Sequence, residues 1–228
     1  MGFPDFKPVS DNGLLVAFGD SMTPQVHDAV LRLDRVLAQH PPHGLVEVVP
    51  AFVNLMVVFD PLVTDHAAMQ AAVQALLGTE VAGSTEGTLR EVQVCFDADL
   101  APDLATVADQ TGLSEEAVID AHLAGELHVV MYGFAPGYAY MTGVPEALHL
   151  PRKQAPVRDV PKGSVLIAGA QCLVSTVTMP TGWWIIGRSP TEILRDDPAR
   201  PFLFDVGDPV RFTRIDRDSY EKAVRANG

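Results

Sequence analysis

Cysteine is scarce in this sequence of 228 residues, and long apolar runs are missing. The two cysteines, Cys95 and Cys172, cannot build a disulfide framework or a closed zinc site by themselves. The longest apolar run, Leu55 to Phe59, is far shorter than the roughly 20 residues that a membrane-spanning helix needs. Residues 1–10 lack a basic start followed by an apolar stretch, so nothing signals secretion. These absences predict a soluble cytoplasmic protein that holds no metal and makes no membrane contact.

Basic residues are also few, because 16 Lys and Arg stand against 29 Asp and Glu, for a net charge of −13. No Lys or Arg occurs between Glu91 and Pro151. A chain with this charge repels a phosphate backbone, which argues against nucleic-acid binding. The charge is uneven: residues 1–151 hold 20 acids and four bases (−16), whereas residues 152–228 hold nine acids and 12 bases (+3). The C-terminal stretch therefore suits a small anionic substrate.

The standard catalytic signatures are missing as well. Lys162-Gly163-Ser164 is in the wrong order for a phosphate-binding loop and lacks the first glycine, and neither G-x-S-x-G nor H-E-x-x-H occurs. Cys95 alternates with apolar residues on a predicted strand and is expected to be buried. Cys172 is predicted to lie in a loop, where no base stands beside it. The sequence therefore offers no evident nucleophile.

Apolar residues make up 47% of the chain, which is enough for a buried core, and their pattern divides the chain into two domains. Residues 1–84 are predicted to form a small α+β domain, a sheet covered on one face by two helices. Thr23 followed by Pro24 predicts the start of the first helix, and the second begins near Asp65. The expected strands are 14–18, 45–49 and 52–59, and the small polar segment 78–88 is expected to be a linker.

Residues 85–228 are predicted to form a β-barrel or sandwich. A strand over 89–96 is followed by two short helices, 103–110 and 114–124, the second capped by Ser114. Beyond it, short apolar segments are separated by Gly and Pro, which favours a barrel or sandwich over βαβ units. The expected strands are 127–132, 164–168, 173–177, 183–186 and 209–212.

Residues 132–190 carry the densest set of candidate binding residues. The segment from Tyr132 to Tyr140 packs two glycines, one proline and four aromatic residues into nine positions. Its aromatic rings either wall a ligand pocket or fill the core at a tight connection. Downstream arginines suit a carboxylate or a phosphate, or else form structural ion pairs. These candidates are His149, Arg152, Arg158 and Arg188.

Five motifs in order resemble the family of the 5-oxoprolinase B subunit, also known as allophanate hydrolase subunit 1 or carboxyltransferase subdomain C/D, which includes an inhibitor of a sporulation histidine kinase. The resemblance covers about the whole chain. Its motifs are Gly133-Phe134-x-Pro136-Gly137-Tyr138-x-Tyr140, Leu148-x-x-Pro151-Arg152, Val160-Pro161-x-Gly163-Ser164-Val165-x-Ile167-Ala168-Gly169-x-Gln171, Gly182-Trp183-x-x-Ile186-Gly187-Arg188-x-Pro190 and Gly207-Asp208-x-Val210-x-Phe212.

The sequence departs from the family pattern at three places near the expected pocket. Arg158 comes one residue later than the family's P-R-x-x-x-P-R predicts. The usual T-G-I-Y-P after Gln171 is replaced by residues 172–176, so its tyrosine is lost, and P-G-G-W becomes Pro180-Thr181-Gly182-Trp183. These changes bear on the substrate more than on the fold.

The resemblance implies an α+β fold with an N-terminal α+β domain and a cyclophilin-like β-barrel. It implies one subunit of an ATP-dependent 5-oxoprolinase, inactive by itself, that acts with a second subunit of related barrel fold (the C type) and a lactam-opening subunit. ATP is implied as a cofactor shared with those partners, and the substrate as a small anionic or amide compound. Within the motifs, His149 is the expected titrating catalytic group, and the expected substrate-binding residues are Gly133, Pro136, Gly137, Tyr138, Tyr140, Arg152, Gln171, Trp183 and Arg188.

Two other functions stay open at this point. The same paired barrels form the carboxyltransferase part of urea carboxylase, which predicts allophanate or urea chemistry. A binding module that inhibits a histidine kinase is the third possibility.

Overall fold

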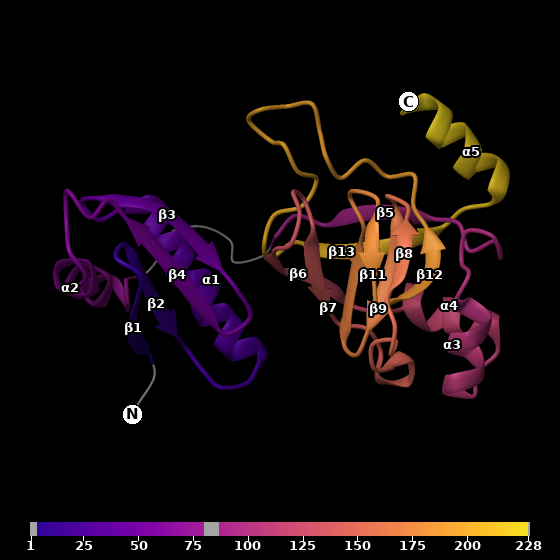
Figure 1. Ribbon diagram of the computed structural model, residues 1–228, viewed down its shortest axis with the longest axis horizontal. Helices are drawn as coiled ribbons and strands as arrows, with labels where there is room; N and C mark the ends of the chain where they lie inside the picture. Colours follow the sequence, from indigo (N-terminus) through magenta and orange to yellow (C-terminus); the bar gives the residue numbers. More distant parts are fainter. Residues whose placement is uncertain (1–3, 80–86, 228) are drawn as a thin grey trace. The chain divides into compact units, whose positions relative to one another are not determined.

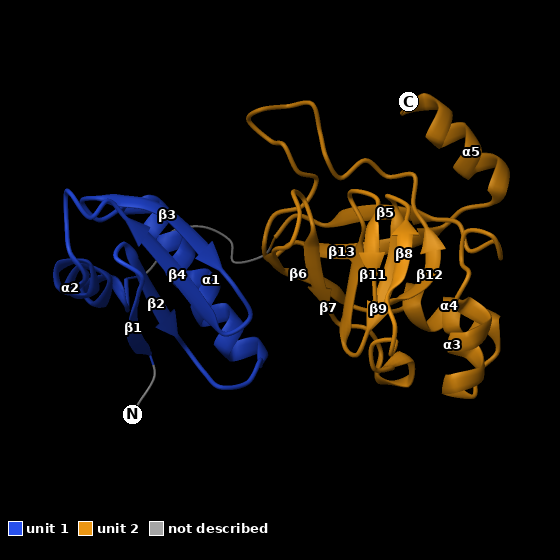
Figure 2. Ribbon diagram, in the orientation of Figure 1, with its two compact units in different colours: residues 1–86 blue, residues 87–228 orange. Residues whose placement is uncertain are grey.

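The computed structural model describes residues 4–79 and 87–227 and divides the chain into two compact units, residues 1–86 and 87–228 (Figures 1 and 2). The boundary predicted between residues 84 and 85 lies outside the described residues. Over the described ranges, every helix is too short or too polar to cross a membrane.

The first unit is an antiparallel sheet with two helices, α1 (Pro24–Gln39) and α2 (His66–Leu76). Its four strands lie in the order β1-β2-β4-β3. They are β1 (Asp5–Val9), β2 (Gly13–Ala17), β3 (Leu45–Pro50) and β4 (Asn54–Phe59). Buried residues of β2, β4 and both helices form one core, which includes Leu14, Val57, Leu37 and Met69. This arrangement confirms the predicted α+β class.

Both helix starts of this unit follow from the sequence. The Thr23 hydroxyl accepts a hydrogen bond from the Val26 N–H at 3.3 Å, and Pro24 opens α1. The Asp65 carboxylate accepts from the Ala68 N–H at 2.8 Å and caps α2. Each cap satisfies one of the N–H groups that a helix leaves unpaired at its first turn.

The second unit contains a seven-stranded sheet in the order β12-β9-β10-β7-β6-β13-β5. Its strands are β5 (Arg90–Val94), β6 (Leu127–Tyr132), β7 (Ala139–Thr142), β9 (Ser164–Ala168), β10 (Gln171–Val174), β12 (Trp184–Arg188) and β13 (Pro209–Arg214). The two outer strands meet at a bridge where Cys95 and Arg188 exchange backbone hydrogen bonds, both 2.9 Å long. This bridge makes the sheet a nearly closed barrel, and it places Arg188 at the point of closure.

Both faces of this sheet are buried. In β9, Val165 and Ile167 point into the barrel core, whereas Leu166 and Ala168 belong to a second cluster on the opposite face. A two-stranded sheet formed by β8 (Val157–Val160) and β11 (Met179–Thr181) contributes Val160 to this second cluster. Double burial explains why β9 is a continuous apolar segment in the sequence.

Four helical elements belong to the second unit (Figure 1). They are α3 (Leu104–Thr111), α4 (Glu115–Leu123), the short 3₁₀ helix η1 (Glu146–Leu148) and α5 (Arg217–Ala226). Leu104 of α3 and Ile119 of α4 join the barrel core. Ser114 caps α4 as predicted, and its hydroxyl accepts from the Ala117 N–H at 3.1 Å. In contrast, α5 has no fully buried residue.

The strand predicted over residues 173–177 occupies residues 171–174 in the structure, so it both starts and ends earlier than predicted. Cys172 is therefore in β10 and fully buried in the barrel core, so the loop position predicted for it is wrong. Burial raises the pKa of the Cys172 thiol, which opposes formation of the thiolate that acts as nucleophile. A nucleophilic role for Cys172 is excluded by this environment.

His122 is fully buried in α4 between Phe96 and Phe212, with ring centroids 6.3 and 4.7 Å away. Neither of its ring nitrogens has a hydrogen-bond partner among the described residues, and desolvation lowers the pKa to about 4. The unfolded chain binds a proton near pH 6.5, whereas the folded chain does not until about pH 4. Stability is therefore complete above pH 6.5 and falls as the pH drops towards 4.

We expect the free energy of unfolding of the second unit to fall by about 2 kcal/mol between pH 7 and pH 5 through His122. Urea unfolding of the wild type and of His122→Met at both pH values measures this contribution. The Met variant should lose about 2 kcal/mol less than the wild type over that range. Parallel pH profiles for the wild type and His122→Met would contradict the expectation.

Candidate functional site

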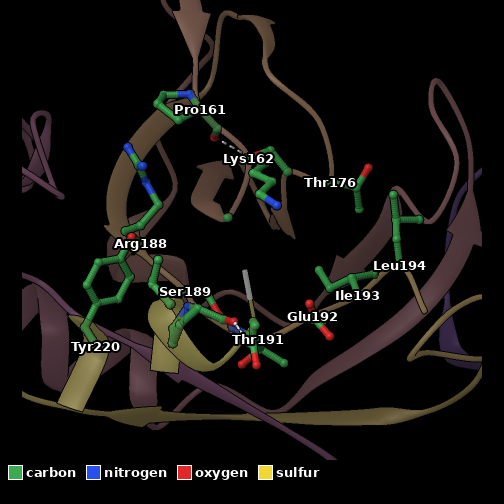
Figure 3. Close-up of a pocket in the computed structure, with 15 residues that line it drawn as sticks. Pro161, Lys162, Thr176, Arg188, Ser189, Thr191, Glu192, Ile193, Leu194 and Tyr220 are labelled. Atoms are coloured by element: carbon green, nitrogen blue, oxygen red, sulfur yellow. Dashed lines mark hydrogen bonds between the residues drawn. The ribbon is translucent and has the colours of Figure 1, made fainter. Parts of the chain in front are cut away.

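A cleft of about 390 Å³ opens where the barrel closes. Its walls come from residues 161–163, 175–176 and 188–194 and from three residues of the C-terminal segment, Tyr220, Val224 and Asn227. Figure 3 shows Arg188 and Tyr220 on one side of it and Ile193 and Leu194 on the other. We call this the Arg188 cleft. Its volume lies within the range of about 300–1,000 Å³ that is usual for small-molecule sites.

The turn at residues 161–164 is fixed by its own hydrogen bonds. Gly163 has a φ of 81°, and a Cβ at this position would lie 2.4 Å from the carbonyl oxygen of Ser189. The Ser164 and Ser175 hydroxyls both donate to the Pro161 carbonyl oxygen, at 2.8 and 2.9 Å. These serines therefore support the turn. Their role is to hold Lys162 at the edge of the cleft.

Arg188 and Lys162 give the cleft its positive charge. Neither has an ion-pair partner within 4.0 Å among the described residues, and the buried Nε of Arg188 has no hydrogen-bond partner there. The side chain of Arg188 extends along the wall towards Pro161, and the Lys162 ammonium points into the cleft (Figure 3). Glu192 is the one acid of the lining, so two cations face one carboxylate. A guanidinium without an ion-pair partner can bind a carboxylate or phosphoryl oxygen without first breaking another ion pair.

The wall formed by α5 is held by contacts at both ends of the helix. At the start of α5, Arg217 makes ion pairs with Asp97 and Asp99. The hydrogen bond from Arg217 lowers the pKa of Asp99, with a smaller contribution from the charge of Arg188. After the last turn, the Asn227 side-chain amide donates to the Pro190 carbonyl oxygen at 2.9 Å. These contacts keep a helix without buried residues against the cleft.

The structure places the predicted binding residues in separate locations. Arg188 lines the cleft, whereas Gln171 begins β10, where its backbone pairs with Thr142 and Ala168. His149 follows η1, is exposed and lies outside the cleft lining. Its Nε2 donates to the Val144 carbonyl oxygen at 2.7 Å.

Four of the predicted residues form an aromatic row that ends in an arginine. Ring centroids are 5.5 Å apart between Tyr138 and Tyr140 and 5.9 Å apart between Tyr140 and Trp183. The guanidinium of Arg152 lies 5.6 Å from the centroid of the Trp183 ring. Tyr138 and Trp183 belong to the buried cluster on the outer face of the sheet, and burial raises the pKa of Tyr138 to about 12. The row therefore serves packing on a face other than the cleft, and its contact with substrate stays a prediction.

Gly133, Pro136 and Gly137 shape the turn between β6 and β7. The Tyr138 N–H donates to the Ala135 carbonyl oxygen at 3.1 Å, and Gly137 has a φ of 68°. Proline followed by a glycine of positive φ is the requirement of a type II turn. The Gly133 N–H donates to the Tyr138 carbonyl oxygen at 3.1 Å, so it is engaged within the turn. The motif glycines therefore have a conformational role, and Gly133 has no free N–H for a ligand.

The order of motifs, the barrel and the cleft lead to the comparison with known proteins. The family model for the carboxyltransferase domain, subdomain C and D, matches residues 4–204. The chain belongs to this family. It is also 34% identical over 226 residues to the 5-oxoprolinase B subunit of Bacillus subtilis (strain 168), across 94% of each chain. With the 5-oxoprolinase B subunit of Escherichia coli O157:H7 it shares 42% identity over 129 residues, 56% of this chain and 58% of that one.

Solved structures of similar proteins show the same fold. The crystal structure of TTHA0988 is 33% identical with a TM-score of 0.78 over 89% of this chain, but the matched part is only 40% of that longer chain. The Kluyveromyces lactis urea amidolyase has a TM-score of 0.76 at 16% identity, over 97% of this chain and 15% of its own. At that identity the likeness concerns the fold. Both neighbours confirm that this carboxyltransferase C/D chain has the predicted fold class.

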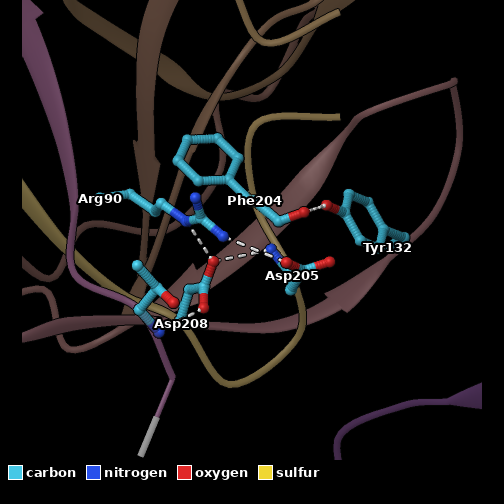
Figure 4. A network of polar contacts seen from close by, with 6 residues as sticks. Arg90, Tyr132, Phe204, Asp205 and Asp208 are labelled. Atoms are coloured by element: carbon cyan, nitrogen blue, oxygen red, sulfur yellow. Dashed lines mark hydrogen bonds and ion pairs between the residues drawn. The ribbon is translucent and has the colours of Figure 1, made fainter. Parts of the chain in front are cut away.

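The closing motif of the carboxyltransferase C/D chain has a structural role (Figure 4). Asp208 is buried, and its carboxylate accepts from the Thr88 N–H at 2.8 Å, from Arg90 Nε at 2.6 Å and from the Asp205 N–H at 2.9 Å. A second nitrogen of Arg90 contacts the Asp205 carboxylate at 3.1 Å. The network joins the start of β5 to the loop before β13, which pairs with it in parallel. It fixes the barrel and contributes nothing to the cleft.

Sequence reasoning missed most of the cleft. It treats Lys162 only as part of a failed phosphate loop, and it does not single out Glu192 or Tyr220. One feature of the sequence could have indicated the cleft: two separate motifs each place a basic residue beside a glycine. These pairs are Lys162 before Gly163 and Arg188 after Gly187. Both bases line the same cleft because β12 pairs with β9, next to which Lys162 lies. No periodicity could have predicted the contribution of α5 to the same cleft.

Proposed function

We propose that the chain is one subunit of an ATP-dependent 5-oxoprolinase complex that converts 5-oxoproline to glutamate. Its proposed partners are a second subunit of related barrel fold and a lactam-opening subunit. The observation that carries the proposal is the match to the 5-oxoprolinase B subunit of Bacillus subtilis over 94% of both chains. That name denotes one subunit of several, so activity is expected from the assembly and not from this chain by itself.

The Arg188 cleft supports this function chemically. 5-Oxoproline carries a carboxylate next to a lactam amide, and activation of the amide by phosphorylation adds further negative charge. Arg188 and Lys162 supply a guanidinium fork and an ammonium for such groups, and neither makes an ion pair within 4.0 Å in the described part of the chain. In a site shielded from water, fixed positive charge stabilises a developing oxyanion more than it would in solution. We assign substrate or phosphoryl binding to these two side chains.

We propose that ATP would bind at the Arg188 cleft through one of its phosphoryl groups. The positive charges of Arg188 and Lys162 suit phosphate oxygens, whereas the described residues contain no glycine-rich loop for a whole triphosphate. When bound, ATP supplies the phosphoryl group that activates the lactam carbonyl. Arg188 and Lys162 would orient the anion, and the α5 wall would limit access of water. A proton-transfer role for His149 stays a prediction, since it lies outside the cleft lining.

The test is turnover by the reconstituted assembly. The chain co-expressed with its two partner subunits should form glutamate from 5-oxoproline only when ATP is added. The same preparation given urea, bicarbonate and ATP should form no carboxylated product. Absence of glutamate from an assembly that purifies intact would contradict the proposal, and product from urea would favour the carboxyltransferase alternative.

A further inference from the structure

Phe134 is exposed to an unusual degree for an aromatic residue in a tight turn. The residue is 75% exposed between β6 and β7. Aromatic rings contribute most to stability when they are buried, and an exposed ring of this size forfeits that contribution. If the ring served the fold, another contact would have to compensate for this lost stability.

The backbone of Phe134 makes the position more costly. Its φ is 71°, and the Ala135 N–H donates to the Gly133 carbonyl oxygen at 2.9 Å, so Phe134 is the central residue of a three-residue γ-turn. The positive-φ form of this turn is rare and strained for an L-residue. Glycine would adopt it without strain, and glycines do occupy nearby positions 133 and 137. The sequence nevertheless places a bulky aromatic residue there.

The fold gains little from the Phe134 ring in return. The ring contacts Tyr138 with centroids 5.6 Å apart, and Tyr138 is already packed in the outer cluster through other residues. Strain combined with exposure is typical of residues that serve a function outside their own fold. The ring is therefore positioned for something that binds this surface.

Other exposed apolar side chains lie close to the same turn. Thr176 donates to the Pro136 carbonyl oxygen at 2.8 Å, which brings the adjacent Val177, 38% exposed, to the turn. The side chain of Leu194, a residue that is 39% exposed, lies 2.7 Å from where a Cβ on Gly137 would be. We call Phe134, Val177 and Leu194 the Phe134 patch. Because Leu194 also lines the Arg188 cleft, the patch adjoins the mouth of the cleft.

We propose that the Phe134 patch is the docking point of the second subunit of the proposed complex, which receives the Phe134 ring in an apolar pocket. Phe134 is 75% exposed and belongs to the lining of neither the Arg188 cleft nor the smaller hollow beside Tyr132. Small molecules bind in concave sites, whereas a projecting aromatic anchor fits a pocket on a protein partner. A partner docked there would also lie over the cleft mouth and exclude water from it.

The solved relatives support a protein occupant. In TTHA0988 the matched fold is 40% of a longer chain, so more than half of that chain accompanies this fold in one molecule. The relatives from Bacillus subtilis and Escherichia coli are each named as one lettered subunit of 5-oxoprolinase, which denotes an assembly. This inference rests on the proposed function, because it takes the second subunit of that complex as the occupant.

The experiment measures assembly and stability separately. Phe134→Gly and Phe134→Ala are compared with the wild type for the dissociation constant with the purified second subunit, for the melting temperature and for turnover of the complete assembly. Phe134→Gly should melt at the same or a higher temperature, because glycine relieves the turn, while the dissociation constant rises at least tenfold. Phe134→Tyr should bind within threefold of the wild type. Leu89→Ala, at an exposed apolar residue before β5, should change neither quantity.

The outcomes separate this inference from the proposed function. If the wild-type assembly turns over 5-oxoproline and Phe134→Gly binds the second subunit with unchanged affinity, the docking proposal is wrong and the function stands. Normal assembly with a raised KM for ATP or 5-oxoproline also overturns docking, in favour of a ring that contacts a small molecule. If the wild type forms no complex and no glutamate, the proposed function itself fails.

Discussion

Arg188→Gln should reduce kcat/KM of the assembled enzyme for 5-oxoproline by roughly 100-fold or more, since loss of one charged donor to a developing oxyanion has about that effect. Arg188 carries one of the two positive charges of the cleft lining and makes no ion pair within 4.0 Å among the described residues. The glutamine side chain keeps much of the length and can donate, but it removes the positive charge. Activity assays on the intact assembly measure the effect.

The fold should survive this substitution. Arg188 holds the barrel closed through backbone hydrogen bonds to Cys95, and these bonds do not depend on the side chain. Within the described ranges the charged group has no carboxylate partner within 4.0 Å to be stranded, so the melting temperature should change by little. Arg188→Lys should restore part of the activity, because it returns the charge without the two-pronged geometry.

Arg211→Gln provides the control for Arg188. Arg211 is exposed in β13 and pairs with Glu91 at 3.6 Å, away from the cleft lining. Its removal should leave both kcat/KM and melting temperature within experimental error, as surface ion pairs contribute little. Equal activity of Arg188→Gln and Arg211→Gln would show that the cleft does not bind the substrate or the phosphoryl group.

Asp208→Ala should destabilise the second unit by about 3–5 kcal/mol, the usual effect of removing one partner from a buried ion pair. Asp208 accepts three hydrogen bonds, and its loss leaves the Thr88 and Asp205 N–H groups and the Arg90 guanidinium without their shared acceptor. The side chain of Arg90 is only 15% exposed, so water replaces that acceptor poorly. Urea unfolding followed by circular dichroism measures the loss.

Asp205→Asn is the matched change in the same network. The side chain of Asp205 is 79% exposed, and among the described residues its carboxylate pairs only with Arg90, so its replacement should cost less than about 1 kcal/mol. A loss for Asp208→Ala no larger than that for Asp205→Asn would contradict the structural role assigned to the closing motif. Each variant removes one carboxylate partner of Arg90, the buried one at Asp208 or the exposed one at Asp205. A difference in stability between the two variants therefore measures the effect of burial.

The elements that the sequence predicts well are those with strong local signals. The caps at Thr23 and Ser114 and the helix start near Asp65 each depend on residues within three positions, and the structure confirms all three predictions. The predicted bounds of β9 match the observed ones because its apolar run is bounded by Gly163 and Gly169. Local hydrogen bonding and apolar runs are properties of short segments, so a single sequence displays them.

Other elements depend on distant pairing and escape prediction. β7 lies in the aromatic segment that the sequence indicates as a binding loop or tight connection, and its strand conformation follows from pairing with β6 and β10. β8 and β11 are three or four residues long and pair only with each other. α5 is strongly charged and buries no residue fully, and its short apolar side, Tyr220 and Val224, was not singled out in the sequence. Each of these is determined by tertiary context.

The candidate site is predicted in part for the same reason. Arg188 stands out in its motif and does line a cleft, whereas Tyr138 and Trp183 from neighbouring motifs are packed on another face of the sheet. Alternation along a strand sends neighbouring residues to opposite faces, and the family motifs do not distinguish the two. Sequence motifs therefore located the barrel but could not separate cleft residues from packing residues.

Omission of this chain from the reconstituted complex tests the central claim most directly. Glutamate formed from isotopically labelled 5-oxoproline is measured with ATP for the complete set of subunits and for the set without this chain. We predict ATP-dependent glutamate formation by the complete set and at least a roughly 100-fold lower rate without the chain, restored when the purified chain is added back. An equal rate with and without the chain, or no glutamate from the complete and intact assembly, would contradict a role for this protein in 5-oxoproline hydrolysis.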